Sequence, residues 1–173
     1  NVVGISDCIP TQPAMFEEIH LSQDIEHHIC DIRNLDEIKA LILKIQPDFI
    51  FHLAAQSIVS LSYADPIKTI STNVMGTTNL LESLRYLSTP CTAVFITSDK
   101  CYENVEWEWG YKETDHLGGK DIYSGSKAAA EILCDSYFHS FLKNKSIYLD
   151  TARAGNIIGG GDFGKDRLVP DII

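Results

Sequence analysis

The sequence predicts an α/β fold in which helices cover a parallel sheet, a doubly wound arrangement. Two patterns along the 173 residues support this prediction. Short apolar runs alternate with amphipathic helical stretches, and the apolar runs end in small or polar residues. Buried parallel strands give such apolar runs, and ligands of these sheets bind where the strands end. We therefore expect one domain with a ligand site at the carboxyl edge of its sheet.

Composition limits the possible partners of the chain. Hydrophobic residues make up 45% and charged residues 22%, as in ordinary globular domains. The formal net charge of −10 argues against a nucleic acid or an anionic membrane as partner. No apolar run approaches the ~18 residues of a membrane span. The five cysteines without a C-x-x-C pair, and a start without a signal peptide, predict a cytoplasmic protein with reduced thiols.

Five strands are expected along the chain, at residues 2–5, 27–30, 48–55, 93–97 and 146–152. The first and third runs are apolar, so we expect both strands to be buried on two faces. Ser6 and Asp7 follow the first strand, a position where a dinucleotide ribose is usually held. An ordinary turn is an equally good explanation of Asp7.

Three helices are expected between the strands. The first begins at Asn34 or Asp36, either of which can cap it. The second spans about 66–87 and the third about 122–142. Long loops are expected at 8–24 and 101–120, and a loop as long as the second is usually functional or a lid. The buried stripe of the third helix is expected to consist of Ala129, Ile132, Leu133, Tyr137 and Phe141.

Several single residues inside these elements have structural explanations. His52 is expected to be a packed, hydrogen-bonded histidine. Asn73 and Gly76 are poor helix formers in the middle of the second helix, so we expect Asn73 to bond a neighbouring strand and Gly76 to permit close packing. His27, His28 and Cys30 suggest a metal site, but neighbouring strand residues point to alternate faces, so no metal is expected.

The third helix begins with Tyr123 and Lys127 four residues apart, which puts both side chains on one face. A phenol titrates near ~10 and is a poor base at neutral pH, whereas an ammonium beside it favours the phenolate. The pair is therefore a candidate acid–base device. A solvated lysine one turn after a tyrosine is the more common explanation of this spacing taken alone.

Five motifs occur along the chain in the order Asp31-Ile32, Leu53-Ala54-Ala55-Gln56, Asn73-Val74-Met75-Gly76-Thr77, Thr97-Ser98-Asp99-Lys100 and Tyr123-Ser124-Gly125-Ser126-Lys127. In this order they resemble the extended short-chain dehydrogenase/reductase family of nucleotide-sugar enzymes, over nearly the whole chain. The resemblance implies a Rossmann-type fold and NAD as cofactor. The residues expected to contact NAD are Ser6, Asp7, Asp31, Ile32, Leu53, Ala54, Ala55, Gln56, Tyr123 and Lys127.

Two further segments narrow the implied substrate. Residues 102–113 resemble the lid segment of family members that remove water from a CDP-hexose, and residues 153–162 with 166–170 resemble their substrate segment. A CDP-sugar is thus the implied substrate. Residues from about 156 to 173 are expected to form the beginning of the region that binds it. Asn156 and Arg167 are candidates for its phosphates, Arg167 through a charge-assisted fork. The alternative for Arg167 is a solvated surface cation.

The resemblance also implies roles for the reacting groups in the intact enzyme. Tyr123 would take the proton of the sugar 4-hydroxyl, with Ser98 hydrogen-bonded to the same oxygen. Asp99 and Lys100 would remove the C5 proton and protonate the leaving 6-hydroxyl. The matching pair in dTDP-glucose dehydratases is Asp-Glu, so the base for C5 stays open. Lys100 would have to be neutral to act as that base.

The family begins with a strand and a G-x-x-G-x-x-G loop that holds the dinucleotide pyrophosphate, and the 173 residues contain neither. In the family's sheet order this strand lies between those at 2–5 and 48–54. We therefore expect residues 1–173 to be a partial NAD(P)-binding domain from a longer chain.

Two alternatives to a dehydratase stay open. A sugar-nucleotide 4-epimerase would share Tyr123 and Lys127 but would not need the Asp99-Lys100 pair. An inactive binding or regulatory remnant is the non-enzymatic alternative. The resemblance further implies a homodimer through the helices at about 66–87 and 122–142.

Overall fold

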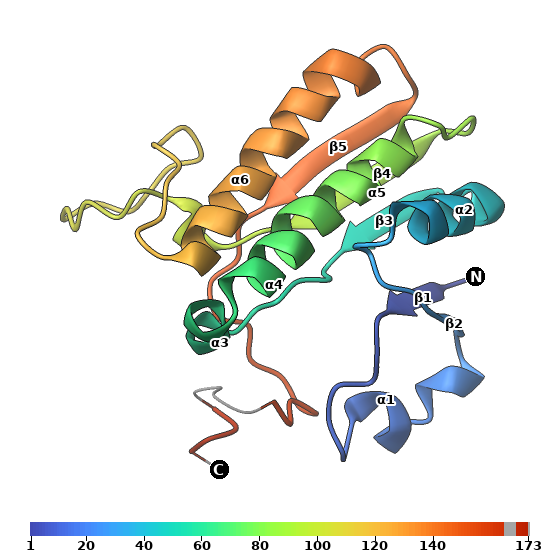
Figure 1. The fold of residues 1–173 in the computed structure, drawn as a ribbon, viewed down its shortest axis with the longest axis horizontal. Coiled ribbons are helices and arrows are strands. Elements are labelled where there is room, and N and C mark those ends of the chain that lie inside the picture. Colours follow the sequence, from blue (N-terminus) through green and yellow to red (C-terminus); the bar gives the residue numbers. More distant parts are fainter. Residues whose placement is uncertain (165–168, 173) are drawn as a thin grey trace.

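The computed structural model describes residues 1–164 and 169–172. Within them the strands form two parallel sheets (Figure 1). The predicted α/β fold with parallel strands is confirmed. One sheet pairs β1 (Val3–Ser6) with β2 (Glu26–Ile29), and the other has β3 (Phe49–His52), β4 (Cys91–Ile96) and β5 (Ile147–Ala152) in the order β3-β4-β5. The break between the sheets falls between β1 and β3, where the family resemblance places a further strand.

The helical segments of the described residues are more divided than the sequence predicts. The helix expected at 66–87 consists of α4 (Pro66–Ile70), a π-helical turn (Ser71–Gly76) and α5 (Thr77–Leu84). The poor helix formers Asn73 and Gly76 both lie in the π-helical turn. The loop expected at 8–24 contains α1 and a 3-10 helix. The bounds are α1 Met15–Glu18, α2 Leu35–Ile45, α3 Val59–Ala64, α4 Pro66–Ile70, α5 Thr77–Leu84 and α6 Ile122–Tyr137, with 3-10 helices Leu21–Gln23 and Asp99–Cys101 and π-helical turns Ser71–Gly76 and Phe138–Leu142.

The hydrophobic core lies between one face of the three-stranded sheet and the helices α2, α5 and α6, which lie side by side over it (Figure 1). Ile38 of α2, Leu81 and Leu84 of α5, and Phe95 of β4 are almost completely buried in this layer. Each such side chain contributes about 1.5–3 kcal/mol by leaving water. The predicted N-cap of α2 is confirmed at Asn34, whose side chain accepts a hydrogen bond from the Glu37 amide.

The opposite face of the sheet is open in the described residues. Phe49 and Phe51 of β3 are 67% and 64% exposed, and Tyr148 of β5 is exposed beside them on the same face. The prediction that the strands at 2–5 and 48–55 are buried on both faces is therefore wrong: β1 is only half-buried and β3 buries one face. A parallel strand is buried on both faces only where helices cover both, and α2, α5 and α6 all cover the same one.

The buried face of α6 also differs from the predicted stripe. Ile132 and Phe141 are exposed, whereas Ser126, Ala130 and Cys134 are buried. Small side chains on this face let α6 pack closely on neighbouring elements, as at the hydrogen bond from Asn73 to Ser126. Leu133 and Tyr137 of the predicted stripe are half-buried and pack against the core. The prediction is therefore correct for these two residues and wrong for Ile132 and Phe141.

The close packing predicted at Gly76 is confirmed, whereas Asn73 bonds the loop that follows a strand and not the strand itself. Asn73 accepts a hydrogen bond from the Gln56 amide at 2.7 Å and donates to the Gln56 carbonyl at 3.0 Å, just after β3. Gly76 packs closely on Ile32, since a Cβ at Gly76 would lie 2.4 Å from Ile32 Cδ1 and 2.7 Å from its Cγ1. Gly76 thus lets α5 approach the segment that follows β2.

Replacing Gly76 with Ala should lower the free energy of unfolding by about 1–3 kcal/mol, because the added methyl overpacks against Ile32. Gly125 of α6 is the matched control, since a Cβ there would meet nothing within 4 Å. Gly125→Ala should stabilise the protein by about 0.5–1 kcal/mol through helix propensity. Urea unfolding of both variants measures the two changes. Equal stability of the Gly76 variant and the wild type would contradict the close packing.

Candidate active site at the carboxyl ends of the strands

The helix α6 is capped by Asp121 and begins at Ile122, so Tyr123 lies in its first turn. The Asp121 side chain accepts hydrogen bonds from the Ser124 amide at 3.0 Å and from the Ser124 hydroxyl at 2.6 Å. Tyr123 and Lys127 are both buried, each 8% exposed. Ser126 between them receives a hydrogen bond from Asn73 at 2.9 Å and donates to the Tyr123 carbonyl at 2.7 Å. The Tyr–Lys turn is therefore fixed from the neighbouring π-helical turn.

Lys127 reaches the end of β4. Its ammonium donates to the carbonyl of Ile96 at 3.3 Å, and burial lowers the pKa of this lysine. A small cavity of about 10 Å³ beside it is lined in part by Ala54 and Ala55 after β3 and by Thr97 after β4. The structure thus brings the predicted residues of three motifs to one place.

The turn Ser98-Asp99-Lys100 lies directly after β4. The Ser98 hydroxyl donates to Asp99 Oδ1 at 3.0 Å and accepts from the Lys100 amide at 3.2 Å. The Lys100 ammonium lies 3.8 Å from the same Asp99 oxygen, and both charged side chains are about half exposed. Asp99 and Lys100, predicted to carry the elimination, are therefore in contact with each other and with Ser98, and both charged side chains face solvent.

The segment after β5 continues this edge. The Asp99 amide donates to the carbonyl of Ala154, so the turn after β4 pairs with the segment expected to bind substrate. At Gly155 a Cβ would lie 3.8 Å from Asp99 Oδ2. The predicted phosphate contact Asn156 is exposed one residue further along. The other predicted phosphate contact, Arg167, lies outside the described residues.

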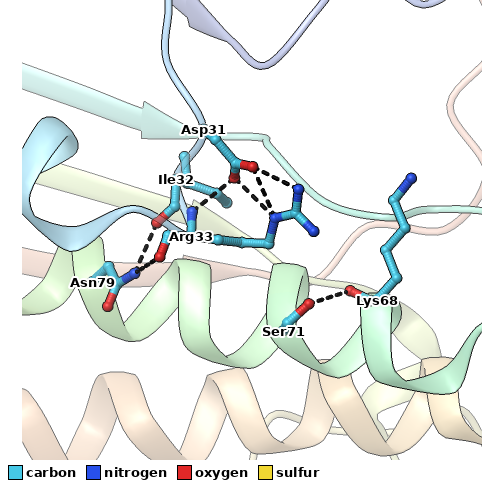
Figure 2. Close-up of polar contacts among 6 residues, drawn as sticks. All are labelled: Asp31, Ile32, Arg33, Lys68, Ser71 and Asn79. Atoms are coloured by element: carbon cyan, nitrogen blue, oxygen red, sulfur yellow. Dashed lines mark hydrogen bonds and ion pairs between the residues drawn. The ribbon is translucent and has the colours of Figure 1, made fainter.

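Two predicted cofactor residues, Asp31 and Ile32, lie in the turn that follows β2 (Figure 2). The Asp31 carboxylate binds the Arg33 amide and its guanidinium, with a shortest contact of 2.6 Å. The hydrogen bonds from Arg33 lower the pKa of Asp31. Asn79 Nδ2 donates to the carbonyls of Ile32 and Arg33 at 2.9 and 3.0 Å, which anchors this turn to α5. An open hollow lies here, lined by Asp31, Arg33, Asn34, Leu35, Asp36 and Ser71.

Other predicted cofactor residues have different surroundings. Ser6 hydrogen-bonds His27 Nε2 at 2.9 Å, while Asp7 and Leu53 are exposed at the ends of their strands. The side-chain amide of Gln56 donates to Thr69 at 2.8 Å and its oxygen accepts from the Ile58 amide at 2.6 Å. The Gln56 side chain therefore serves the loop after β3. Its contact with NAD stays a prediction, as do those of the other residues.

Sequence reasoning missed the buried ion pair between Glu131 of α6 and Arg153 after β5. Glu131 accepts from Arg153 Nε at 3.1 Å and Nη2 at 3.0 Å, and also from the hydroxyls of Thr97 and Thr151. Burial alone would raise the pKa of Glu131, but these hydrogen bonds lower it. Glu131 follows Lys127 by four residues, so an acid on the same helix face was the available signal.

His52 is packed as predicted, beside the candidate site. Its Nε2 lies 3.0 Å from the Thr77 hydroxyl, and its ring meets Phe95 edge-on. Burial, with a smaller contribution from the charge of Lys127, lowers the pKa of His52 to about 4.

This depressed pKa predicts how stability depends on pH. The unfolded chain binds a proton at His52 below about pH 6.5, whereas the folded protein does so only below about pH 4. Between these values the unfolded state holds more protons, so the free energy of unfolding should fall as pH falls, by up to roughly 3 kcal/mol. Urea unfolding across this range checks the slope. A slope that stays the same in His52→Gln would contradict the assignment.

No helix in residues 1–164 and 169–172 is long and apolar enough to cross a membrane. In the same residues no group of three or more His, Cys, Asp or Glu side chains is placed to hold a metal ion. His28 instead contacts Glu26 at 2.7 Å.

Comparison with known families identifies the class. The family model described as GDP-mannose 4,6 dehydratase matches residues 11–148. The chain therefore belongs to this family of nucleotide-sugar enzymes, within the extended short-chain dehydrogenases/reductases, and the family expected from the sequence is confirmed.

Individual relatives narrow the class further. The CDP-glucose 4,6-dehydratase of Salmonella typhimurium (strain LT2) is 47% identical over 99% of this chain and 49% of its own length. The CDP-paratose 2-epimerase of Salmonella typhi is 30% identical over 77% of this chain and 43% of its own length. The chain thus spans about half the length of the curated relatives it matches.

A solved structure supports the fold. A double mutant of the dTDP-glucose 4,6-dehydratase DesIV from Streptomyces venezuelae, solved with NAD, matches with a TM-score of 0.83. The match covers 98% of this chain and 50% of that one at 20% identity. At this identity the likeness shows a common fold and nothing more.

Proposed function

We propose that this chain is part of an NAD-dependent enzyme that removes water from CDP-glucose and gives CDP-4-keto-6-deoxyglucose, a step of deoxysugar biosynthesis. The 47% identity to a CDP-glucose 4,6-dehydratase over almost the whole chain carries the proposal. The contact of Ser98, Asp99 and Lys100 at the strand edge beside the Tyr–Lys helix supports it. An elimination needs an acid–base pair that a simple hydride transfer does not.

The residues present fit NAD at several points of the strand edge. Lys127 offers a buried ammonium at the end of β4, small residues follow β3, and Asp31 carries a carboxylate after β2. These groups lie along the carboxyl edge of the strands, where they could contact the ribose, the nicotinamide and the adenine of a bound dinucleotide. When bound, NAD would take a hydride from the sugar C4 and later return it to C6.

The chain's own residues would move the protons. Tyr123 would accept the proton of the 4-hydroxyl, and the buried cation of Lys127 would favour its phenolate form. Ser98 would hydrogen-bond the same sugar oxygen. The ketone at C4 then acidifies C5, because the carbanion there is delocalised as an enolate. Asp99 or Lys100 would take the C5 proton, while the other protonates the departing 6-hydroxyl.

A homodimer in the cytoplasm belongs to the same proposal. Ile67 of α4, Met75 of the π-helical turn and Ile132 of α6 are exposed on the two helices that the family resemblance assigns to a dimer. Unpaired thiols, four of them buried, suit a reducing compartment. Sedimentation of the complete gene product at the mass of one chain would contradict the dimer.

Product analysis tests the proposal. The complete gene product should convert CDP-glucose to a product lighter by one water, and should leave UDP-glucose largely unconverted. A product of unchanged mass with inverted C4 would establish the epimerase alternative instead. Absence of NAD binding and of turnover would favour an inactive remnant.

A further inference from the structure

Arg153 touches three parts of the chain at once. Its Nε and Nη2 donate to Glu131 of α6, at 3.1 and 3.0 Å. Its Nη1 donates to the Glu113 carbonyl at 2.9 Å, and its guanidinium carbon lies 4.7 Å from the centre of the Tyr102 ring. The first contact leads to the helix of Tyr123, and the other two lead to the lid segment, residues 102–113.

The Glu131 end of this arrangement is rigid. Glu131 is 6% exposed and accepts four hydrogen bonds, two of them from Thr97 after β4 and Thr151 of β5. A bidentate pair to a buried carboxylate fixes the plane of the guanidinium. Arg153 therefore presents Nη1, which does not contact Glu131, and its flat face to the lid segment in one orientation.

Arg153 contacts both the outgoing and the returning side of the loop that contains the lid segment. Backbone hydrogen bonds pair the two sides at the base, from the Glu103 amide to the His116 carbonyl and from the Gly118 amide to the Cys101 carbonyl. Tyr102 lies on the outgoing side of the loop and Glu113 on the returning side, so Arg153 contacts both sides.

Aromatic rings continue the contact outward from Arg153. Tyr102 stacks on Tyr111 with ring centres 5.0 Å apart, and Tyr111 lies 5.5 Å from Trp107. The Tyr111 hydroxyl also bonds Asn104 and Val105 near the tip. A displacement of the guanidinium would therefore shift the residues along the lid segment that these contacts connect.

We propose that Arg153 is a positioning residue for the dehydration: held by Glu131, it keeps the lid segment against the helix of Tyr123 and thereby sets the affinity for the CDP-sugar. This inference rests on the proposed function. Arg153 acts on the substrate through Tyr102 and Glu113, and the chemical step stays with Tyr123 and the Ser98-Asp99-Lys100 turn.

Arg153→Lys in the complete gene product tests this role. Lysine keeps a cation beside Glu131 but has no planar fork with which to reach Glu113 and Tyr102 together. KM for CDP-glucose should rise about tenfold while kcat changes less than about threefold. Trypsin should cleave after Lys112, inside the lid segment, about tenfold faster, as followed by mass spectrometry.

Arg85→Lys is the matched control. Arg85 pairs with Glu82 at 2.7 Å and lies 4.0 Å from the Phe141 ring, outside the lid and the strand edge. KM and the cleavage rate at Lys112 should both stay at the wild-type values in this variant. Changes equal to those of Arg153→Lys would overturn the inference.

Variants of Glu131 test whether Arg153 acts together with this carboxylate. Glu131→Gln should raise KM like Arg153→Lys, and the double variant should be no worse than either single one, because the two side chains act as a unit. Wild-type KM and cleavage in Arg153→Lys, or a fall in kcat alone, would overturn it. Should CDP-glucose prove not to be a substrate, the proposed function fails, and the cleavage rate still decides whether Arg153 holds the lid segment.

Discussion

Replacing Tyr123 with Phe should lower kcat of the complete gene product about 10²–10⁴-fold, the usual contribution of a positioned general base. The phenol oxygen is the only atom lost, and Asp121 and Ser126 hold the turn through contacts that do not involve it. NAD should therefore bind the variant with the wild-type affinity. Steady-state kinetics and cofactor titration measure the two effects.

Tyr86→Phe is the matched control for this substitution. Tyr86 lies after α5, where the Lys39 ammonium sits 3.3 Å from the centre of its ring, and phenylalanine keeps that ring. Its kcat should equal that of the wild type. Normal turnover by Tyr123→Phe would refute the assignment of the base.

Replacing Asp99 with Asn should stop the elimination and leave the first oxidation at C4 intact. Asparagine keeps the size of the side chain and can still accept from Ser98, but it cannot take a proton from C5. Mixing the variant with NAD and CDP-glucose should give a burst of NADH absorbance without a dehydrated product. Stopped-flow absorbance with product analysis measures both.

Asp135→Asn is the control for Asp99, since Asp135 lies exposed on α6 and pairs with His139 at 3.3 Å. It should turn over normally. If Asp99→Asn gives no burst, the division of labour between Tyr123 and the Asp99-Lys100 pair is wrong. If it forms the keto sugar at the wild-type rate, Lys100 or another group takes the C5 proton.

Local patterns predicted much of the fold. The cap at Asn34, the packed His52 and the tight contact at Gly76 follow from chemistry within a few residues, and the structure confirms all three. The parallel strands also follow from their apolar runs and polar ends. The place of Ser98 and Asp99 at the strand edge could be predicted because the carboxyl ends of parallel strands meet. Lys127 could be predicted to share a helix face with Tyr123 from their spacing.

Features that depend on distant pairing could not be predicted from those patterns. The buried face of α6 was assigned to its apolar residues, yet Glu131 is buried because Arg153, 22 positions later, neutralises it. The exposure of Phe49 and Phe51 depends on which face of the sheet the helices cover, and an apolar run does not contain that information.

Transfer of a label from C4 to C6 of the sugar distinguishes the proposed dehydration from other reactions of the family. CDP-glucose carrying deuterium at C4 should be incubated with NAD and the complete gene product, and the product examined by NMR and mass spectrometry. We expect loss of one water and deuterium at C6 of a 4-keto-6-deoxy sugar. Deuterium retained at C4 of a sugar of unchanged mass would contradict the proposed dehydration.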